Sequence, residues 1–556
     1  MNTPALQQRL GNGRIDAVIV LTIVVAWLGF VALLTGGWRM IFWDTFRDMA
    51  WAENICAGQV WADPSLPNQS YWYAPGNPLL AAGLALLTRQ PVVSIYGYSA
   101  FWWDALIPVA IYLLVRTVWD RLTALCALPA VFLGSFTWLT HCTATTPGFQ
   151  GVVFELVGLL CWHRCVQATA GSTGLPRRRW IWAPVTGFVL SLSAWYHPLC
   201  AIVLAAAIGL HTALDMAVPG LGHAATRHRP SGHLALLGPM LVVALVAATL
   251  TAPLMMHFLP LQARNPALLH FFADELIDPR YYAQALAPLV VLGVLPGVWF
   301  IVRRTPQAAW VIAYLLVGLL GQAAGYLAQL RGWRMPYLLP HEFLWHAQLA
   351  TGICAAVGVT GLARALAQGA HSAPGRRAAV GLAAVALLVV TTGPGARGLP
   401  QSGKYLRDLE PLLARTAEVR AWIRANTSLA ATFLSSSDTT YEIVCGLTGR
   451  KGVVLPPGHT NPAVNPADRS RDSQTMLETT DPGTFRLLAE RYGVTHLVLV
   501  FMTPAPVPEV RARYAPWSWL EPVFHSSDGT AIIYHVRAAE RADEARGTAP
   551  RGSNEP

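Results

Sequence analysis

Charged residues are scarce in this chain, at 13% of its 556 residues, whereas 54% of the residues are hydrophobic. A soluble globular domain has about 25% charged residues, so this composition excludes an ordinary soluble protein. Lysine is nearly absent, with only Lys404 and Lys451, and arginine supplies the positive charge. The net charge of +10 comes from short arginine clusters between apolar runs. Such clusters are typical of cytoplasmic membrane loops and argue against nucleic-acid binding.

Several short motifs are also missing. The eight cysteines include no CxxC pair, which argues against a disulfide scaffold or a zinc knuckle. The part of the chain after about residue 400 contains no phosphate-binding glycine fingerprint and no serine, histidine and aspartate spacing typical of a nucleophilic triad. The first apolar run, 15–34, is too long for a signal-peptide core and lacks a small-residue cleavage site. It therefore predicts an uncleaved first membrane span.

Long apolar runs predict a polytopic α-helical membrane protein, because a helix needs about 20 apolar residues to cross a bilayer. We expect about eleven transmembrane helices, at 15–35, 97–115, 122–140, 149–167, 180–195, 198–214, 235–257, 283–302, 307–329, 341–363 and 378–396. The stretch 77–90 is apolar but short, and its placement decides the topology of every later loop.

The arginines decide how 77–90 is placed. With a cytoplasmic N-terminus and 77–90 not counted as a span, the inner side carries 15 arginines, namely Arg9, Arg14, Arg116, Arg121, Arg164, Arg177, Arg178, Arg179, Arg227, Arg229, Arg303, Arg304, Arg364, Arg376 and Arg377. The outer side then carries seven, namely Arg39, Arg47, Arg89, Arg264, Arg280, Arg331 and Arg334. This distribution satisfies the positive-inside rule. Counting 77–90 as a span would place most of the arginine clusters outside, against that rule. We therefore expect 77–90 at the outer interface and 36–96 to form one long outer segment.

The composition changes to that of a soluble domain at about residue 400. Short apolar runs at 431–434, 452–455, 495–501 and 531–536 predict strands, and helical patterns lie between them. The sequence thus predicts a membrane domain over 1–397, a C-terminal soluble α/β domain over 398–540 and a disordered tail over 541–556. By the same topology we expect the C-terminal domain to lie outside, in the periplasm or the extracellular space. The expected location is a bacterial inner membrane.

Two acids open the long outer segment. Asp44 and Asp48 are four residues apart, so on a helix they share a face. A solvated helix face or an N-terminal cap is one interpretation. Because these acids directly follow a transmembrane helix, a general base for an incoming hydroxyl group is the functional alternative. A second functional alternative is that the two carboxylates hold a divalent cation beside a phosphate.

The segment then continues with Ala52, Ala57 and Gly58, and with an aromatic and proline-rich run over 71–79. In this pattern the chain resembles the GT-C superfamily of membrane glycosyltransferases, and within it the lipid-donor branch of aminoarabinose, mannose and arabinofuranose transferases. The family has an acid just after the first helix and an interfacial helix after the aromatic and proline-rich run. The resemblance implies a GT-C-like membrane domain along nearly the whole chain and an outer α/β domain.

The resemblance also implies roles for residues of the first outer segment. Asp44 matches the acid proposed to deprotonate the acceptor hydroxyl, and Asp48 with Arg47 is the weaker candidate. Tyr71, Tyr73 and Asn77 belong to the aromatic and proline-rich run and are expected to bind substrate.

Many family members carry a second acid in the next outer loop. This chain has none over 140–150, and either Glu155 or His141 is expected to take its place.

Further polar residues lie in or beside the apolar runs. Asp104 and Glu155 lie within predicted spans, where carboxylates usually face the bundle interior, although Asp104 could also snorkel to the interface. Arginine suits a lipid phosphate because its planar fork makes paired hydrogen bonds. We therefore expect Arg334 or Arg331 to clamp such a phosphate. The other candidates for substrate binding are His197, His341, Glu342 and His459, of which His459 belongs to a polar loop of the C-terminal domain.

The function predicted from these features is inverting sugar transfer at the outer leaflet. A polyprenyl-phosphate-linked sugar is the expected donor, and a glycan, a glycolipid or a protein is the expected acceptor. No cofactor is required by the sequence, and a divalent cation is left open. A lipid-linked oligosaccharide flippase or transporter, an O-antigen-type polymerase or ligase, and a family member without activity are the alternatives.

Overall fold

The computed structural model of the chain resolves into two compact units. The first unit comprises Met1–Cys56 and Trp72–Leu413, and the second comprises Ala57–Tyr71 and Ala414–Pro556. The structure describes residues 3–35, 40–41, 43–134, 138, 147–170, 179–217, 236–264, 293–331, 340–366, 373–396, 407–456, 459–461, 463–500 and 512–537. The predicted tail 541–556 lies outside these residues.

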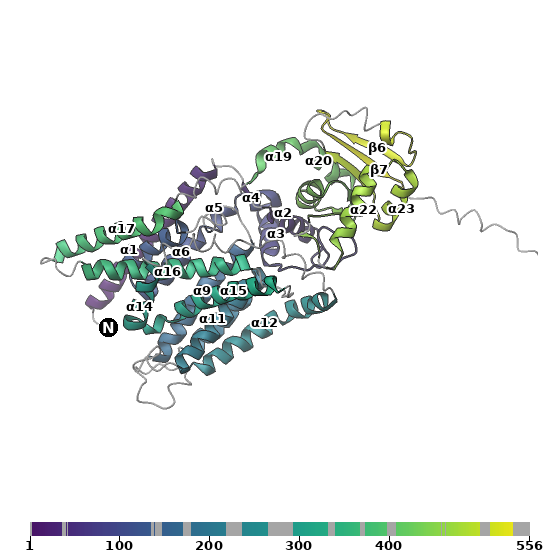
Figure 1. Ribbon diagram of the computed structural model, residues 1–556. Helices are drawn as coiled ribbons and strands as arrows, with labels where there is room; N and C mark the ends of the chain where they lie inside the picture. The colour runs from purple at the N-terminus through teal and green to yellow at the C-terminus, as the bar shows by residue number, and fades with distance from the viewer. Residues whose placement is uncertain are drawn as a thin grey trace, which may run out of the picture. The chain divides into compact units, whose positions relative to one another are not determined.

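The first unit is a bundle of helices (Figure 1). Its helices are α1 (Thr3–Thr35), α2 (Thr45–Cys56), α3 (Gly76–Thr88), α4 (Val92–Gly97), α5 (Ser99–Trp102), α6 (Leu106–Val118), α7 (Arg121–Phe132), α9 (Pro147–Ala170), α10 (Arg179–Tyr196), α11 (Pro198–Ala217), α12 (Leu237–Arg264), α14 (Leu295–Arg304), α15 (Trp310–Leu330), α16 (Pro340–Leu366) and α17 (Ala373–Ala396). Strand β1 (Met40–Ile41) pairs with β2 (Arg407–Asp408) in an antiparallel manner. Every range predicted as a span contains a helix or part of one.

The protein is a multi-pass membrane protein. Among the described residues, six segments are long and apolar enough to cross a bilayer: Gly13–Leu33, Ser99–Val118, Pro198–Ala217, Leu237–His257, Pro306–Ala328 and Glu342–Leu366. The count of eleven spans stays a prediction. Helix α3, which covers most of 77–90, has 13 residues, fewer than the roughly 20 that a crossing needs.

Helix α16 lies at the centre of the first unit and packs against α7, α14, α15 and α17. Small residues allow this close packing, since membrane helices approach one another where side chains are short. A Cβ atom at Gly297 of α14 would lie 1.9 Å from the carbonyl oxygen of Cys354 in α16. A Cβ atom at Gly358 of α16 would lie 2.1 Å from the carbonyl oxygen of Gly293. The backbones of α14 and α16 therefore touch directly.

The second unit contains a five-stranded sheet in the order β4-β3-β5-β7-β6. The strands are β3 (Thr432–Leu434), β4 (Lys451–Gly452), β5 (His496–Val500), β6 (Leu520–His525) and β7 (Ala531–Val536). Strand β3 pairs with β4 and β5 in parallel, whereas β7 pairs with β5 and β6 in antiparallel fashion. The helical elements are α19 (Leu409–Arg415), which spans the boundary between the units, and α20 (Ala417–Asn426), α21 (Ser437–Thr439), η9 (Thr440–Gly446), α22 (Pro466–Glu478) and α23 (Pro482–Tyr492).

Four of these strands overlap the runs expected from the sequence, but β6 and helix α22 were not expected. Strand β6 lies at the sheet edge and has a register shift between Pro522 and Phe524. Proline is confined to such edges because it cannot donate a ladder hydrogen bond, so its presence hid the strand. Helix α22 has few apolar residues and gives no clear helical period in the sequence.

The segment 57–71 belongs to the second unit, although the sequence predicted 36–96 as one outer segment. Buried Asp63 explains this division. Its Oδ1 accepts hydrogen bonds from the backbone of Ser65 at 2.7 Å and Leu66 at 2.8 Å, and its Oδ2 accepts one from Asn461 Nδ2 at 2.7 Å. The Lys451 ammonium group donates to its carbonyl oxygen. The segment is thereby tied to residues that lie almost 400 positions later.

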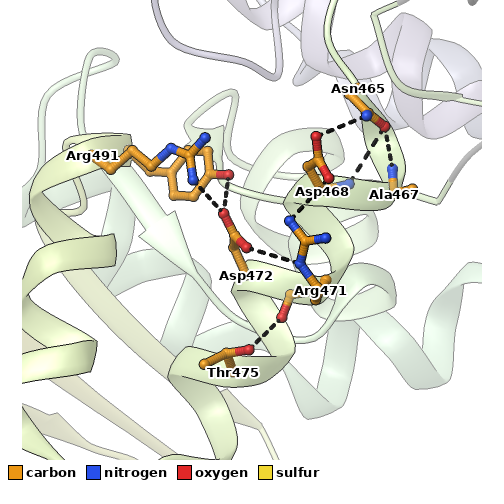
Figure 2. Close-up of polar contacts among 8 residues, drawn as sticks. Asn465, Ala467, Asp468, Arg471, Asp472, Thr475 and Arg491 are labelled. Carbon is orange, nitrogen blue, oxygen red and sulfur yellow. Dashed lines mark hydrogen bonds and ion pairs between the residues drawn. The ribbon is translucent and has the colours of Figure 1, made fainter.

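Figure 2 shows how α22 begins and how it is joined to α23. The side chain of Asn465 caps α22 by accepting from the backbone of Ala467 and Asp468. Buried Asp472 accepts from Arg491 Nη1 at 2.9 Å and from the Tyr492 hydroxyl at 2.8 Å, both at the end of α23. One carboxylate therefore joins the two helices.

We expect Asp472→Ala to loosen α22 and α23. The substitution leaves the Tyr492 hydroxyl and the Arg491 guanidinium without their acceptor, which costs about 1–3 kcal/mol. Hydrogen exchange of the backbone amides in these helices should accelerate about 5- to 150-fold. The control is Glu478→Gln, an exposed residue at the end of α22, which should leave exchange unchanged. Equal exchange in both variants would contradict this role for Asp472.

Candidate functional site

The two predicted acids differ in their surroundings. Asp44 directly precedes α2 and is half-buried, and its carbonyl oxygen accepts from the backbone of Arg47 at 3.2 Å. Asp48, one turn into α2, is 1% exposed. Its Oδ1 lies 3.2 Å from Arg47 Nε, and its Oδ2 accepts from Asn77 Nδ2 at 2.8 Å. Asp44 therefore keeps access to the surface, whereas Asp48 is enclosed.

Burial raises the pKa of Asp48 above its ordinary value, and the charge of Arg47 and the hydrogen bond from Asn77 oppose this rise. These two partners stabilise the ionised carboxylate in a buried position. Asp48 is thus suited to hold Arg47 and Asn77 in place. Its neighbour Asp44 is the better placed of the two acids to meet a molecule from outside.

Arg47 connects the acids to the aromatic and proline-rich run. Its Cζ lies 3.9 Å from the centre of the Tyr73 ring, in the geometry of a cation–π interaction. The Tyr73 ring is 6.1 Å from the ring of His197, which it meets edge-on. Burial raises the pKa of Tyr73 well above its ordinary value, so its hydroxyl stays protonated. Arg47, Tyr73 and His197, which were predicted separately from the sequence, are therefore neighbours.

His197 leads further into the bundle. It lies between α10 and α11, with Nε2 3.7 Å from Glu342 Oε1 of α16 and Nδ1 3.9 Å from Cys200 Sγ of α11. Glu155 of α9 is fully buried, and its Oε2 lies 2.9 Å from His346 Nδ1 of α16. The ligand atoms of Glu155, Cys200 and His346 all lie within 4.8 Å of one another.

These contacts form one continuous set of buried and half-buried polar side chains, which we call the polar track. It consists of Arg47, Asp48, Tyr73, Asn77, Glu155, His197, Cys200, Glu342 and His346. The sequence did not single out Cys200 or His346. A signal existed, since His346 lies four residues after Glu342 on α16, so the two share a helix face. Cys200 lies three residues after His197, in the first turn of α11.

Comparisons with known proteins give the fold. No protein-family model matches the chain, and no curated protein matches it by sequence. Solved structures do match. The oligosaccharyltransferase AglB from Archaeoglobus fulgidus, in complex with an inhibitory peptide and a dolichol-phosphate, is 12% identical with a TM-score of 0.55, and the match covers 94% of this chain and 74% of AglB.

Two other solved structures are similar over most of this chain. ArnT from Cupriavidus metallidurans in the apo state is 13% identical with a TM-score of 0.54, over 95% of this chain and 98% of ArnT. The arabinofuranosyltransferase AftD from Mycobacteria is 17% identical with a TM-score of 0.59, over 93% of this chain but 40% of AftD. All three proteins are GT-C membrane glycosyltransferases. This chain has the GT-C fold. The predicted resemblance is thus confirmed at the level of the fold, which is what identities this low establish.

Other predicted site residues are not among the residues that make up the polar track, or lie outside the described residues. Asp104 is fully buried beside α5, so it does not snorkel to the interface. Arg331 is exposed at the end of α15. His141 and Arg334 lie outside the described residues, and His341 is described only as part of α16.

Tyr71 and His459 both belong to the second unit. Tyr71 is buried, and its ring lies 6.1 Å from that of Trp61. The ring of His459 stacks on Tyr441 at 4.5 Å. Their predicted part in substrate binding stays a prediction.

A divalent cation held by Asp44 and Asp48 was left open by the sequence. The Arg47 guanidinium already lies 3.2 Å from Asp48, and Asn77 donates to the other carboxylate oxygen. A dication bound to Asp48 would therefore be placed next to a buried cation. Asp48 is therefore a poor ligand for a metal ion, a metal at Asp44 stays a prediction, and no chemical step below depends on one.

Gly76 brings the aromatic and proline-rich run of the GT-C fold against α10. A Cβ atom at this position would lie 2.6 Å from Cδ2 of Tyr196 and 2.7 Å from the carbonyl oxygen of Trp195. Tyr196 cannot move freely, because its ring stacks on Trp103 with centroids 5.6 Å apart. Only glycine permits this approach, and it sets the position of Tyr73 and Asn77 on either side.

We expect Gly76→Ala to lower the melting temperature of the detergent-solubilised protein, because overpacking of this kind costs about 1–3 kcal/mol. The control is Gly83→Ala in the same helix, where a Cβ atom meets nothing within 4 Å. That change should leave the melting temperature unchanged or raise it, since alanine favours helix by up to about 1 kcal/mol. Equal melting temperatures in the two variants would show that the approach at Gly76 is not tight.

Proposed function

We propose that the chain is a membrane glycosyltransferase that moves a sugar from a polyprenyl-phosphate donor to an acceptor hydroxyl group. The observation that carries the proposal is the polar track, which begins beside half-buried Asp44 and runs into the apolar bundle. Charged groups inside a membrane bundle are costly, so they usually mark a substrate or ion site. Two solved structures with this fold support a lipid-phosphate donor, since AglB was determined with a dolichol-phosphate and ArnT with undecaprenyl phosphate.

The proposed reaction is a single displacement. The acceptor oxygen attacks the anomeric carbon of the sugar, and the bond from that carbon to the phosphate oxygen breaks. The lipid phosphate leaves with the bonding electrons, and the Asp44 carboxylate takes the proton of the acceptor hydroxyl. Attack opposite to the leaving group inverts the anomeric configuration.

Asp44 is assigned the role of base because it is the more accessible acid at the start of the track. Glu155, which the sequence predicted as a possible second catalytic acid, is buried in the bundle and faces His346. A general base must reach the proton that it removes, and an enclosed carboxylate paired with a histidine is less suited to that task. We therefore place acceptor activation at Asp44 alone.

Arginine is proposed to meet the donor phosphate. Arg47 holds a buried positive charge on the Tyr73 ring, and Asp48 with Asn77 fixes its orientation. A guanidinium group fixed in this way offers paired donors to a phosphate without first having to be ordered. Arg331 and Arg334 of the outer loop are the further candidates. The eleven-span topology, with the N-terminus inside and the reaction at the outer leaflet, belongs to the same proposal.

We expect Asp44→Asn to lower the rate of sugar transfer at least about 100-fold, the usual contribution of a positioned general base. Purified protein in detergent is incubated with candidate polyprenyl-phosphate sugars and acceptors, and release of polyprenyl phosphate is measured. Transfer in detergent also separates an enzyme from a flippase, because transport needs two compartments.

The matched control for Asp44→Asn is Glu53→Gln, an acid of the adjoining helix α2 that is also half-buried and lies outside the polar track. It should retain the wild-type rate. Full activity of Asp44→Asn would remove Asp44 as the base. Absence of transfer by the wild-type protein with every donor, together with lipid translocation in vesicles, would instead favour a flippase.

A further inference from the structure

Three different helices bring potential metal ligands together in the core of the first unit. Glu155 comes from α9, Cys200 from α11 and His346 from α16, and all three residues are at most 1% exposed. Their ligand atoms lie within 4.8 Å of one another, and Glu155 Oε2 and His346 Nδ1 are 2.9 Å apart. The sequence positions are 155, 200 and 346, so only the packing of the helices produces this cluster.

We propose that Glu155, Cys200 and His346 bind one divalent transition-metal ion of the zinc type. A thiolate, an imidazole and a carboxylate are the donors that zinc accepts, whereas magnesium and calcium take oxygen ligands. Tetrahedral zinc bonds place neighbouring donor atoms about 3.4–3.6 Å apart. The longest separation in the cluster must therefore shorten by about 1 Å, which side-chain rotation can supply.

The charges of this donor set suit a site in the membrane interior. The carboxylate of Glu155 and the thiolate of Cys200 together balance a dication, and neutral His346 adds no charge. The complete site is then electrically neutral, which a low-dielectric environment favours.

The buried carboxylate also lacks a full set of partners. Among the described residues, none lies in hydrogen-bond geometry to Glu155 Oε1, although this atom is fully enclosed. The neighbouring donor is the buried Tyr314 hydroxyl, which lies 3.0 Å from His346 Nδ1. A buried acceptor of this kind requires an explanation, and a bound metal ion is one. An ion between Glu155 and Cys200 would supply its missing partner.

His197 contacts Cys200 and is the candidate for a fourth ligand, although it is not one of the three residues whose ligand atoms all lie within 4.8 Å of one another. Its Nδ1 lies 3.9 Å from Cys200 Sγ, so it faces the cluster, while its Nε2 lies 3.7 Å from Glu342 Oε1. Histidines that bind metal commonly donate their other ring nitrogen to a carboxylate, which fixes the tautomer and the ring orientation. Glu342 is the residue that can do this for His197. The site would then have four protein ligands, as closed structural zinc sites do.

The first measurement is zinc binding by the purified full-length protein in detergent. After treatment with a chelator, the protein should take up one zinc ion per chain, and its melting temperature should rise with the zinc concentration. In the cobalt-substituted protein, a thiolate-to-cobalt charge-transfer band should appear. Failure of the wild-type protein to bind either ion would overturn the proposal and leave a buried glutamate–histidine pair.

Cys200→Ser should remove the charge-transfer band and weaken zinc binding at least about tenfold. The control is Cys161→Ser, a buried cysteine of α9 that is not in the cluster and should preserve both. Glu155→Gln, which keeps the side-chain shape, should also weaken zinc binding if Cys200→Ser fails to fold. Unchanged binding in Cys200→Ser and Glu155→Gln would mean that zinc binds elsewhere, and would overturn the proposal. None of these readouts depends on glycosyltransferase activity.

Discussion

A guanidinium group buried in a helical bundle has to be neutralised where it lies, and Arg47 sets this requirement for the first unit. Asp48 of the same helix supplies the opposite charge, and Asn77 completes the hydrogen bonding of that carboxylate. The Tyr73 ring covers the cation. Because Tyr73 and Asn77 lie on either side of Gly76, these contacts fix residues 73–77 of the aromatic and proline-rich run against α2. The position of that run, in turn, brings Tyr73 to His197 and so to the interior of the bundle.

The polar track also explains why Asp44 differs from the other acids of the bundle. Asp48, Glu155 and Glu342 each face a basic partner, namely Arg47, His346 or His197. Asp48 forms an ion pair with the Arg47 guanidinium group, and Glu155 and Glu342 each lie beside a histidine. Acids enclosed with such partners stabilise the arrangement of helices more readily than they take a proton from a substrate. Asp44 lies at the start of α2 with part of its surface exposed. The proposed role of Asp44 as the base, with the enclosed acids in structural roles, rests on this difference in burial.

The sequence predicted the helices of the membrane part because apolar runs report directly on burial in lipid. It did not predict the cluster around Cys200 and His346, since both lie in apolar runs and only the packing of α9, α11 and α16 reveals their proximity to Glu155. The sequence also did not predict that the segment 57–71 belongs to the second unit. Nothing local indicates that Asp63 pairs with residues near the other end of the chain. Patterns along the chain predict helices and strands, whereas the candidate site depends on contacts between helices that are distant in the sequence.

The most direct test of the account is a structure of the full-length protein in a lipid nanodisc with bound polyprenyl phosphate. The account predicts density for the phosphate within about 4 Å of the guanidinium group of Arg47, Arg331 or Arg334. It also predicts that, of the acids of the first unit, Asp44 lies nearest to the side of that phosphate that faces solvent. A phosphate that contacts none of these arginines, or that is separated from Asp44 by intervening protein, would contradict the proposed site.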